Sequence, residues 1–254
     1  MYNNIFDTHA HYDDSKFDED RHELLTSLSD LGVSDVINCG CDLKTSLASV
    51  SLSKSFDFLY AAVGVHPHEA QDTTEDDLIK IKELYNEKKV VAIGEIGLDY
   101  HYDFSPRERQ LEIFEKQLIL ANDLNLPVII HDREAHEDTL TLLKKYNPKG
   151  VVHCFSGSKE MAREIVELGM YIGIGGAIIF KNARKPVEVV EYLPVDKLLL
   201  ETDAPYMTPV PHRGKRCDSS YIAYTAEKIA EIKKIDVQQL IDICNLNAIN
   251  LVGI

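Results

Sequence analysis

Short apolar segments alternate with amphipathic segments along most of the chain. After an apolar start at Ile5-Phe6, the segment Asp18–Leu31 repeats leucine at helical spacing and meets a stop at Gly32. The same alternation predicts strands over Val33–Cys39, Phe58–Val65, Val90–Glu95, Leu126–His131, Gly150–Phe155, Met170–Gly175 and Asp196–Thr202. It predicts further helices over Leu43–Ser53, Glu75–Glu87, Pro106–Asn125, Glu134–Tyr146, Lys159–Leu168, Ser219–Lys234 and Val237–Leu251.

This order of elements is typical of a (β/α)8 TIM barrel. The apolar runs lack the polar alternation of half-exposed strands, as expected where both faces of a parallel sheet are buried. A doubly wound sheet is the alternative. It would lead us to expect a phosphate-binding fingerprint after an early strand, and the chain contains neither GxGxxG nor a Walker sequence. We therefore expect an α/β fold with one TIM-barrel domain over residues 1–254.

The composition agrees with one folded, water-soluble domain. Hydrophobic residues make up 44% of the 254 residues and charged residues 27%, and no Pro/Gly/Ser-rich block marks a linker. There is no basic segment followed by a long apolar one at the start, and no apolar run approaches the roughly 20 residues that span a bilayer. The five cysteines form no CxxC pair, so we expect reduced thiols, with Cys39 and Cys41 as small buried residues. These features predict a cytoplasmic protein.

Candidate metal ligands come at the ends of five of the predicted strands. His9 and His11 are two residues apart and therefore face the same side of a strand, with Asp7 behind them. The C-terminal ends of barrel strands form the floor of an active site. The polar residues at or just after these ends are His9, His11, Glu95, His131, His153 and Asp203. Any one histidine could be a buried, hydrogen-bonded residue, but four at one rim favour a metal site.

The number of donors favours two metal ions over one. Six nitrogen and oxygen donors exceed the four of a closed zinc site and leave a carboxylate free to bridge. The expected assignment is one ion held by His9, His11 and Asp203, a second held by His131 and His153, and Glu95 as the bridge. Mixed imidazole and carboxylate ligands suit zinc, manganese or cobalt, and magnesium is a further candidate.

The charge restricts where a phosphate could bind. A formal net charge of −15 argues against a surface coated by nucleic acid, because most of the surface would repel a polyanion. A phosphate substrate must therefore meet local positive charge. The loops after the last two barrel strands often hold phosphate in this architecture, and here they contain Lys181, Arg184, Lys185, Arg213, Lys215 and Arg216. Solubilising surface cations are the alternative; we expect Arg213 and Lys215 to contact the substrate.

Ordered motifs run from end to end of the chain. They are His9-Ala10-His11, Gly94-Glu95-Ile96-Gly97-Leu98-Asp99-Tyr100, His131, His153-Cys154-Phe155-Ser156-Gly157 and Glu201-Thr202-Asp203-Ala204-Pro205. Together they resemble the motifs of TatD-type metal-dependent deoxyribonucleases, in the amidohydrolase superfamily. The segments Gly64–His68 and Arg213–Arg216 also look like segments of that family. The resemblance implies a TIM-barrel hydrolase that cleaves phosphodiester bonds in DNA, with the six residues as ligands of two divalent ions.

One segment departs from the family pattern. After Arg216 we would expect a sequence close to Asn-Glu-Pro, whereas Cys217-Asp218-Ser219 stand here. This departure puts substrate contacts from the loop in doubt and leaves the metal ligands untouched.

Catalytic roles follow from these assignments. We expect a water activated by two metal ions to attack phosphorus, with Asp203 orienting or deprotonating that water and Glu95 shared between the ions. His66 and Tyr100 are candidate substrate contacts, although a proline-containing loop and a rim tyrosine explain them almost as well. Glu201 either orients a ligand from behind or is an interior carboxylate paired with a cation.

Two other classes of function remain open. An amidohydrolase or deaminase would act on a cyclic amide, a lactone or a nucleobase, but relatives of that kind often use a carboxylated lysine as the bridge, where Glu95 stands here. A catalytically silent barrel that serves as a binding scaffold would have no need for six intact ligands. The expected partner is DNA or another phosphodiester, with no membrane and no obligate protein partner.

Overall fold

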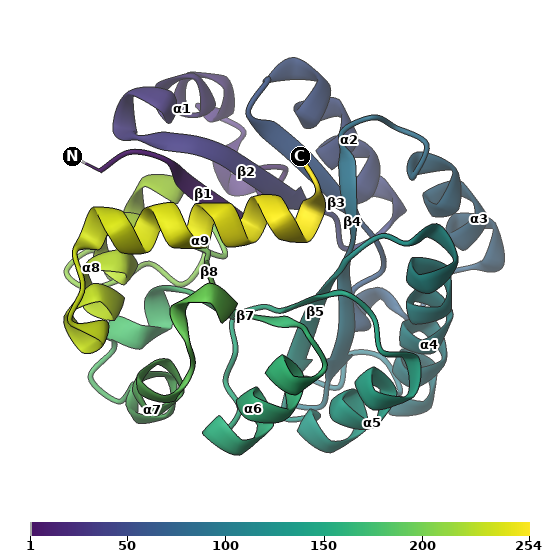
Figure 1. Cartoon of the computed structure of the whole chain (residues 1–254). Helices are drawn as coiled ribbons and strands as arrows, with labels where there is room; N and C mark the ends of the chain where they lie inside the picture. Colours follow the sequence, from purple (N-terminus) through teal and green to yellow (C-terminus); the bar gives the residue numbers. More distant parts are fainter. Residues whose placement is uncertain (1) are drawn as a thin grey trace.

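The computed structural model describes residues 2–254 and contains one eight-stranded parallel sheet. Each strand pairs with the next one in the sequence, so the order around the barrel is β1 to β8 (Figure 1). The strands are β1 (Ile5–Ala10), β2 (Val33–Cys39), β3 (Leu59–Val63), β4 (Val90–Asp99), β5 (Val128–Arg133), β6 (Gly150–Val152), β7 (Tyr171–Ile174) and β8 (Leu198–Leu200). The predicted TIM barrel is confirmed.

The first strand and the segment after the last one meet at the C-terminal rim. Ala10 pairs in parallel with Ala204. The backbone N–H of His11 donates to the Ala204 carbonyl at 2.7 Å, and the N–H of Asp203 donates to the His9 carbonyl at 2.9 Å. The same hydrogen bonds that bring the barrel ends together therefore place His9, His11 and Asp203 side by side.

Helices surround the sheet and join successive strands (Figure 1). They are α1 (Arg21–Ser27), α2 (Leu43–Ser55), α3 (Glu75–Leu84), α4 (Arg107–Leu124), α5 (His136–Tyr146), α6 (Lys159–Glu167), α7 (Arg184–Tyr192), α8 (Ile222–Lys233) and α9 (Val237–Val252). The starts of α2 and α3 are fixed by reciprocal capping hydrogen bonds, between Asp42 and Thr45 and between Thr74 and Asp77.

The C-terminal helix α9 lies across one end of the barrel (Figure 1). Its Ala248 belongs to a cluster of buried apolar side chains that come from strands all round the barrel, among them Phe6, Ile129 and Leu199. A larger cluster packs the strands against the surrounding helices and includes Phe114 and Leu118 of α4. The packed interior leaves the C-terminal rim of the strands as the place for polar chemistry.

Some element bounds differ from the sequence prediction. The predicted helix Asp18–Leu31 is shorter, because α1 ends at Ser27 and a 3-10 turn runs to Gly32, whose φ of 87° stops it as expected. Strand β4 continues past Glu95 to Asp99. Strand β8 is limited to Leu198–Leu200, because a 3-10 turn follows Pro194. Helix α7 has no predicted counterpart; Pro186 in its first turn weakens the helical pattern.

The cysteines and the helices bear on two predictions made from the sequence. All five cysteines are free thiols, as predicted. Within residues 2–254, none of the helices combines the length and the apolar character that a membrane crossing requires.

Candidate metal centre

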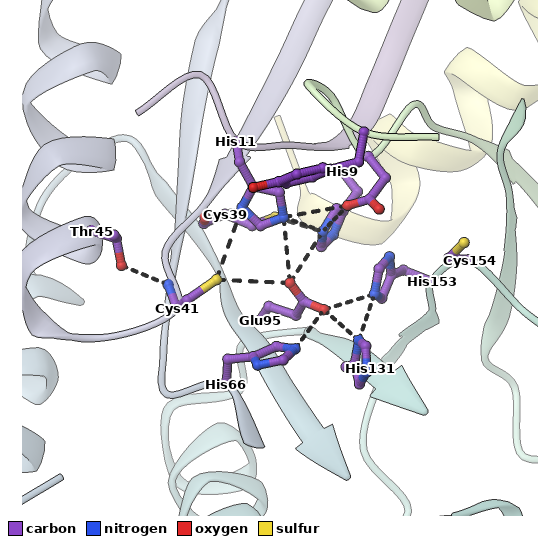
Figure 2. Close-up of polar contacts among 12 residues, drawn as sticks. His9, His11, Cys39, Cys41, Thr45, His66, Glu95, His131, His153 and Cys154 are labelled. Atoms are coloured by element: carbon purple, nitrogen blue, oxygen red, sulfur yellow. Dashed lines mark hydrogen bonds and ion pairs between the residues drawn. The ribbon is translucent and has the colours of Figure 1, made fainter. Parts of the chain in front are cut away.

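The six predicted ligands converge on one point at the C-terminal rim. The Glu95 carboxylate lies at the centre, and Figure 2 shows the rings of the surrounding histidines directed toward it. Glu95 and His153 are buried, and His9 has no exposed surface. The structure thus brings together side chains from strands β1, β4 and β5 and from the segments that follow β1, β6 and β8.

The local backbone explains how β1 presents two imidazoles. His9 and His11 lie on the same side, and their Nε2 atoms are 3.0 Å apart. The Nδ1 of His11 is 2.9 Å from the Cys39 carbonyl, which can only accept, so Nδ1 carries a proton and the neutral form of the ring has its lone pair on Nε2, on the side of the cluster. Asp7 does not join them: its carboxylate accepts from the backbone N–H of His9 and from Thr202 and Ser219.

The first group of donors surrounds one oxygen of Glu95. Glu95 Oε2 is 3.3 Å from His9 Nε2 and 3.5 Å from His11 Nε2. Asp203 Oδ1 is 3.7 Å from His9 Nε2 and 3.5 Å from His11 Nε2. Two ligands that each lie about 2.0 to 2.1 Å from a tetrahedral ion are about 3.3 to 3.4 Å apart. The distances of both carboxylate oxygens from the two imidazole nitrogens therefore suit a shared cation, and His9, His11 and Asp203 form one of the clusters that could hold a metal ion.

The second group surrounds the other oxygen of Glu95. Glu95 Oε1 is 2.8 Å from His131 Nδ1 and 2.8 Å from His153 Nε2. These two nitrogens are 3.4 Å apart. Glu95 Oε1 is also 3.5 Å from His66 Nε2. Each oxygen of one carboxylate thus faces its own set of imidazoles, which is the arrangement of a bridging ligand. The donor set fits the two-ion assignment expected from the sequence.

The electrostatics of Glu95 and His9 agree with this fit. Burial raises the pKa of a carboxyl such as Glu95, but the imidazoles of His153, His66 and His9 hold it well below its usual range. Burial lowers the pKa of His9 to about 4, so this ring is neutral at physiological pH. A charged carboxylate and a neutral imidazole are the forms that bind metal ions.

Asp99 supports His131 and was not predicted from the sequence. Its Oδ2 is 3.1 Å from His131 Nε2 and 2.9 Å from His68 Nε2. With Nε2 donating to Asp99, neutral His131 has its lone pair on Nδ1, on the side of Glu95. Asp99 is thus a buried carboxylate that sets the tautomer of a ligand. The available signal was its spacing: Glu95, residue 97 and Asp99 share one face if the strand continues.

His66 takes a different role from the other histidines near Glu95. Its Nδ1 accepts the backbone N–H of His68 at 3.1 Å, so a neutral ring carries its proton on Nε2. Burial holds the pKa of His66 well below its ordinary value, which keeps the ring neutral. The Nε2–H lies 3.5 Å from Glu95 Oε1 and lines the cavity in front of the cluster. Contact between His66 and a substrate stays a prediction, and His66 also forms a donor cluster with Glu95 and His131 that could hold a metal ion.

Glu201 lies behind His153. It is fully buried, and its Oε1 accepts the backbone N–H of Cys154 and is 3.9 Å from His153 Nδ1. Neither His153 Nδ1 nor Glu201 Oε2 has a hydrogen-bond partner. A side chain on Gly173 would collide with this carboxylate, so the glycine makes the room that Glu201 occupies. Burial raises the pKa of Glu201 to about 7.

Two thiols lie closer to the cluster than the sequence indicated. Cys39 is buried as expected, with its sulfur 3.4 Å from His9 Nδ1. Cys41 lies at the edge of the cluster, with its sulfur 3.9 Å from His11 Nδ1 and 4.0 Å from Glu95 Oε2 (Figure 2). Burial raises the pKa of Cys41 to about 11, so the group is a thiol at neutral pH. Cys41, His11 and Glu95 together form one of the donor clusters that could hold a metal ion.

The cluster opens into a cavity of about 1300 Å³. Asp203, His66 and His131 lie in its wall, together with Arg184 and Lys185 from the start of α7. The wall also holds cations that the sequence analysis did not single out, which are Arg21, Lys44 and Arg133.

Three of the predicted substrate contacts lie elsewhere. The Tyr100 hydroxyl donates to Asp138 at 2.6 Å. The Arg213 guanidinium lies 4.0 Å from the centre of the Phe180 ring. Neither Tyr100, Arg213 nor Lys215 is among the residues that line the cavity. Contact with the reacting group is therefore not supported for them, and contact with a longer substrate stays a prediction.

Comparison with known proteins agrees with the geometry. A family model for TatD-related DNases matches residues 6–253. The chain is 46% identical over 247 residues to the "Uncharacterized metal-dependent hydrolase YabD" of Bacillus subtilis (strain 168), covering 96% of this chain and 97% of that protein. It is 36% identical over 264 residues to the 3'-5' ssDNA/RNA exonuclease TatD of Escherichia coli (strain K12), covering 98% and 99% of the two chains. Among solved structures, the TatD homolog YJJV of Escherichia coli K12 matches with a TM-score of 0.94 and 32% identity over 100% of both chains.

Proposed function

The chain belongs to the family of TatD-related DNases, whose relatives are named metal-dependent hydrolases, and from this premise we propose that it is a two-metal phosphodiesterase that removes nucleotides from single-stranded nucleic acid. The observation that carries the proposal is the position of Glu95, each of whose oxygens faces a separate set of donors. The names of more distant relatives, which are 3'-5' ssDNA/RNA exonucleases, support the substrate class. The predicted cytoplasmic location would suit such a substrate.

The ligand assignment is part of the proposal. His9, His11 and Asp203 would hold one divalent ion, His131 and His153 the other, and Glu95 both. When bound, such ions supply Lewis acidity to the phosphoryl oxygens and lower the pKa of water. A carboxylate bridge rather than a carboxylated lysine is the feature that separates this site from the amidohydrolase alternative.

The side chains around the donors have definable tasks. Burial opposes ionisation of Asp203, but the neighbouring imidazoles of His11, His9 and His153 lower its pKa, so it is a carboxylate that can orient the attacking water and accept its proton. His66 presents an Nε2–H to the cavity and can donate to a non-bridging phosphoryl oxygen. Arg184 and Lys185 in the cavity wall can attract the phosphate backbone.

A metal-reconstituted activity screen tests the proposal. The protein is stripped with chelator, reloaded with Mg²⁺, Mn²⁺, Zn²⁺ or Co²⁺, and offered single- and double-stranded DNA, RNA, a chromogenic phosphodiester and a cyclic amide side by side. We expect stepwise shortening of 5'-labelled single strands with at least one metal, and no activity in excess chelator. Hydrolysis of the cyclic amide with no cleavage of any phosphodiester would contradict the proposal and favour the amidohydrolase alternative.

The number of ions is measured on the same preparations. Elemental analysis of protein reloaded and then desalted should give up to two divalent ions per chain. The double variant Glu95→Ala with Asp203→Asn serves as a control for contaminating nucleases, because it lacks both the proposed bridge and the proposed proton acceptor. Uptake of no metal under any condition would overturn the two-ion assignment.

A further inference from the structure

Two aromatic side chains are exposed beside the metal centre. Tyr102 and Phe104 follow β4, and 47% of Tyr102 and 66% of Phe104 are accessible to solvent. Their rings are stacked, with centroids 5.2 Å apart and an angle of 17° between the planes. Tyr102 lies in the wall of the cavity that contains the metal donors. The pair is exposed apolar surface beside the cavity.

The pair is connected to the donors through one histidine. The His68 ring meets Phe104 edge-on at 4.8 Å and Tyr102 edge-on at 5.5 Å. The same ring bonds to Asp99, which in turn bonds to His131. The rings therefore have a fixed position relative to the site where a phosphoryl group would react.

The charge around the pair suits a nucleotide. The Arg133 guanidinium lies 4.7 Å from the centre of the Tyr102 ring. Arg133 lines the cavity, and so do Arg184 and Lys185. In a chain of net charge −15, cations next to an exposed aromatic pair match a ligand that has both a phosphate and a planar base.

We propose that Tyr102 and Phe104 form a stacking subsite for a base of single-stranded nucleic acid, next to the nucleotide whose phosphodiester bond is cleaved. This inference rests on the proposed function and adds the part of the site that distinguishes single-stranded nucleic acid from a duplex. Bases of a duplex are stacked on each other, whereas an unpaired base offers its face to an aromatic ring. The subsite reads no sequence, because every base has such a face.

Other exposed aromatics on the chain do not share these properties. Tyr206 also lines the cavity and has the Lys16 ammonium over its ring, but its hydroxyl bonds to Asp14 and, among the described residues, no second aromatic ring is stacked on it. Tyr192, at the end of α7, is 51% exposed and does not line the cavity. It therefore provides a matched control of similar exposure.

The test measures stacking and binding without cleavage. A single-stranded oligonucleotide with phosphorothioate linkages and one 2-aminopurine base is titrated with the metal-loaded protein, since stacking quenches the fluorescence of that base. The Phe104→Ala variant should lose the quench and bind about 10-fold more weakly, as is typical for one base on one aromatic side chain. Phe104→Trp should restore both properties, and Tyr192→Ala should match the wild-type protein.

An abasic oligonucleotide of the same length separates stacking from other causes. We expect wild-type protein and Phe104→Ala to bind this strand equally. An equal loss with the abasic strand, an unchanged quench in Phe104→Ala, or a change in oligomeric state that accounts for the loss would overturn the subsite. If wild-type protein cleaves single strands and Phe104→Ala does so with unchanged KM, the subsite is wrong and the proposed function stands. If wild-type protein neither binds nor cleaves them, the proposed function fails as well.

Discussion

Replacing Asp99 by asparagine tests how strongly the metal centre depends on a residue that contacts no ion in the proposed assignment. Asp99 is fully buried. Its Oδ1 accepts the backbone N–H groups of His101 at 3.0 Å and Tyr102 at 2.9 Å, and its Oδ2 accepts from His68 and His131. All four neighbours donate, so the position requires two acceptor oxygens, and asparagine offers one.

The size of the effect follows from this mismatch. If the amide oxygen stays on the backbone donors, the amide NH₂ faces the imidazoles, and His131 must present Nε2 as an acceptor and Nδ1–H toward Glu95. The lone pair available to an ion is then lost. Changes of such supporting partners weaken metal binding about 10- to 100-fold, which corresponds to about 1.4 to 2.7 kcal/mol. The opposite amide orientation leaves buried backbone donors unpaired, at a cost of about 1 to 3 kcal/mol in stability.

Calorimetric titration of metal-free Asp99→Asn with Zn²⁺ or Co²⁺ measures the change in metal affinity. Urea unfolding of the same samples measures the change in stability and checks the fold. Asp138→Asn is the control, because Asp138 is an aspartate that accepts a hydrogen bond from Tyr100 and lies away from the metal donors. Turnover at saturating metal should recover in part. Wild-type affinity for both ions together with wild-type stability would refute the reasoning.

Acid titration gives the same residue an independent readout. Burial opposes ionisation of Asp99, but hydrogen bonds from His131, Tyr102 and His68 lower its pKa below the ordinary value of 3.8. Because the pKa is lower in the folded state, its contribution to stability is fully present above pH 3.8 and is lost as the pH falls below that value. The Asp99→Asn protein should therefore lose part of the acid dependence of its unfolding free energy.

Four further outcomes are expected. Glu95→Ala should bind at most one ion per chain by elemental analysis, since both donor groups lose the carboxylate that they share; two tightly held ions would show that Glu95 is not the bridge. Asp203→Asn should lower turnover by about 10²-fold or more with the fold kept, and near-normal turnover with unchanged metal content would make Asp203 structural. Hydrogen bonding to Asp99 and Glu95 raises the pKa of His131 to about 9 against the effect of burial. Metal affinity should therefore rise by up to about tenfold per pH unit below that pH and level off above it, with proton release measured by calorimetry. Metal affinity that does not change with pH would contradict this. Arg213→Ala with Lys215→Ala should raise KM only for long DNA and reduce the slope of log affinity against log salt by about 1 per lost phosphate contact, and an unchanged slope would mean that these cations are ordinary surface.

The convergence of the candidate metal ligands was predictable because it follows from simple strand geometry. A strand places residues two apart on one side, which fixes His9 beside His11. Parallel barrel strands bring their C-terminal ends to one rim, so a polar residue at the end of an apolar run can be assigned to that rim from the sequence. His131 and His153 come at such ends, and the structure confirms that they lie beside Glu95.

Asp99 was missed because the predicted strand stopped too early. The apolar run Val90–Ile93 reads as a complete strand that ends at Glu95, which places Asp99 in a loop. In the structure β4 continues to Asp99, with the apolar Ile96 and Leu98 buried in the core and Asp99 directed at His131. The alternation of apolar and polar positions from 95 to 99 contains this information, but only when the strand is allowed to extend beyond its most apolar part.

The positions of the loop residues could not be predicted at all. Arg213 and Lys215 lie in a segment after β8 that has no periodic pattern, so the sequence does not show that Arg213 turns onto the Phe180 ring. Cys41 follows β2 by two residues, and its approach to Glu95 depends on the course of the turn before α2. Loop paths are set by tertiary contacts, and a sequence pattern does not contain them.

The charge of the cavity explains how an acidic chain could still bind a polyanion. Its wall holds the cationic side chains Arg21, Lys44, Arg133, Arg184 and Lys185 and the anionic side chains Asp13, Asp14, Asp18, Glu69, Glu95, Asp132 and Asp203. With neutral imidazoles, the excess is two negative charges, and two divalent ions would turn it into two positive charges. Metal ions at this site would therefore control whether a phosphodiester is attracted or repelled, before any bond is broken. Binding of substrate and binding of metal would then be linked, because without the ions the seven carboxylates leave the wall of the cavity with a negative excess.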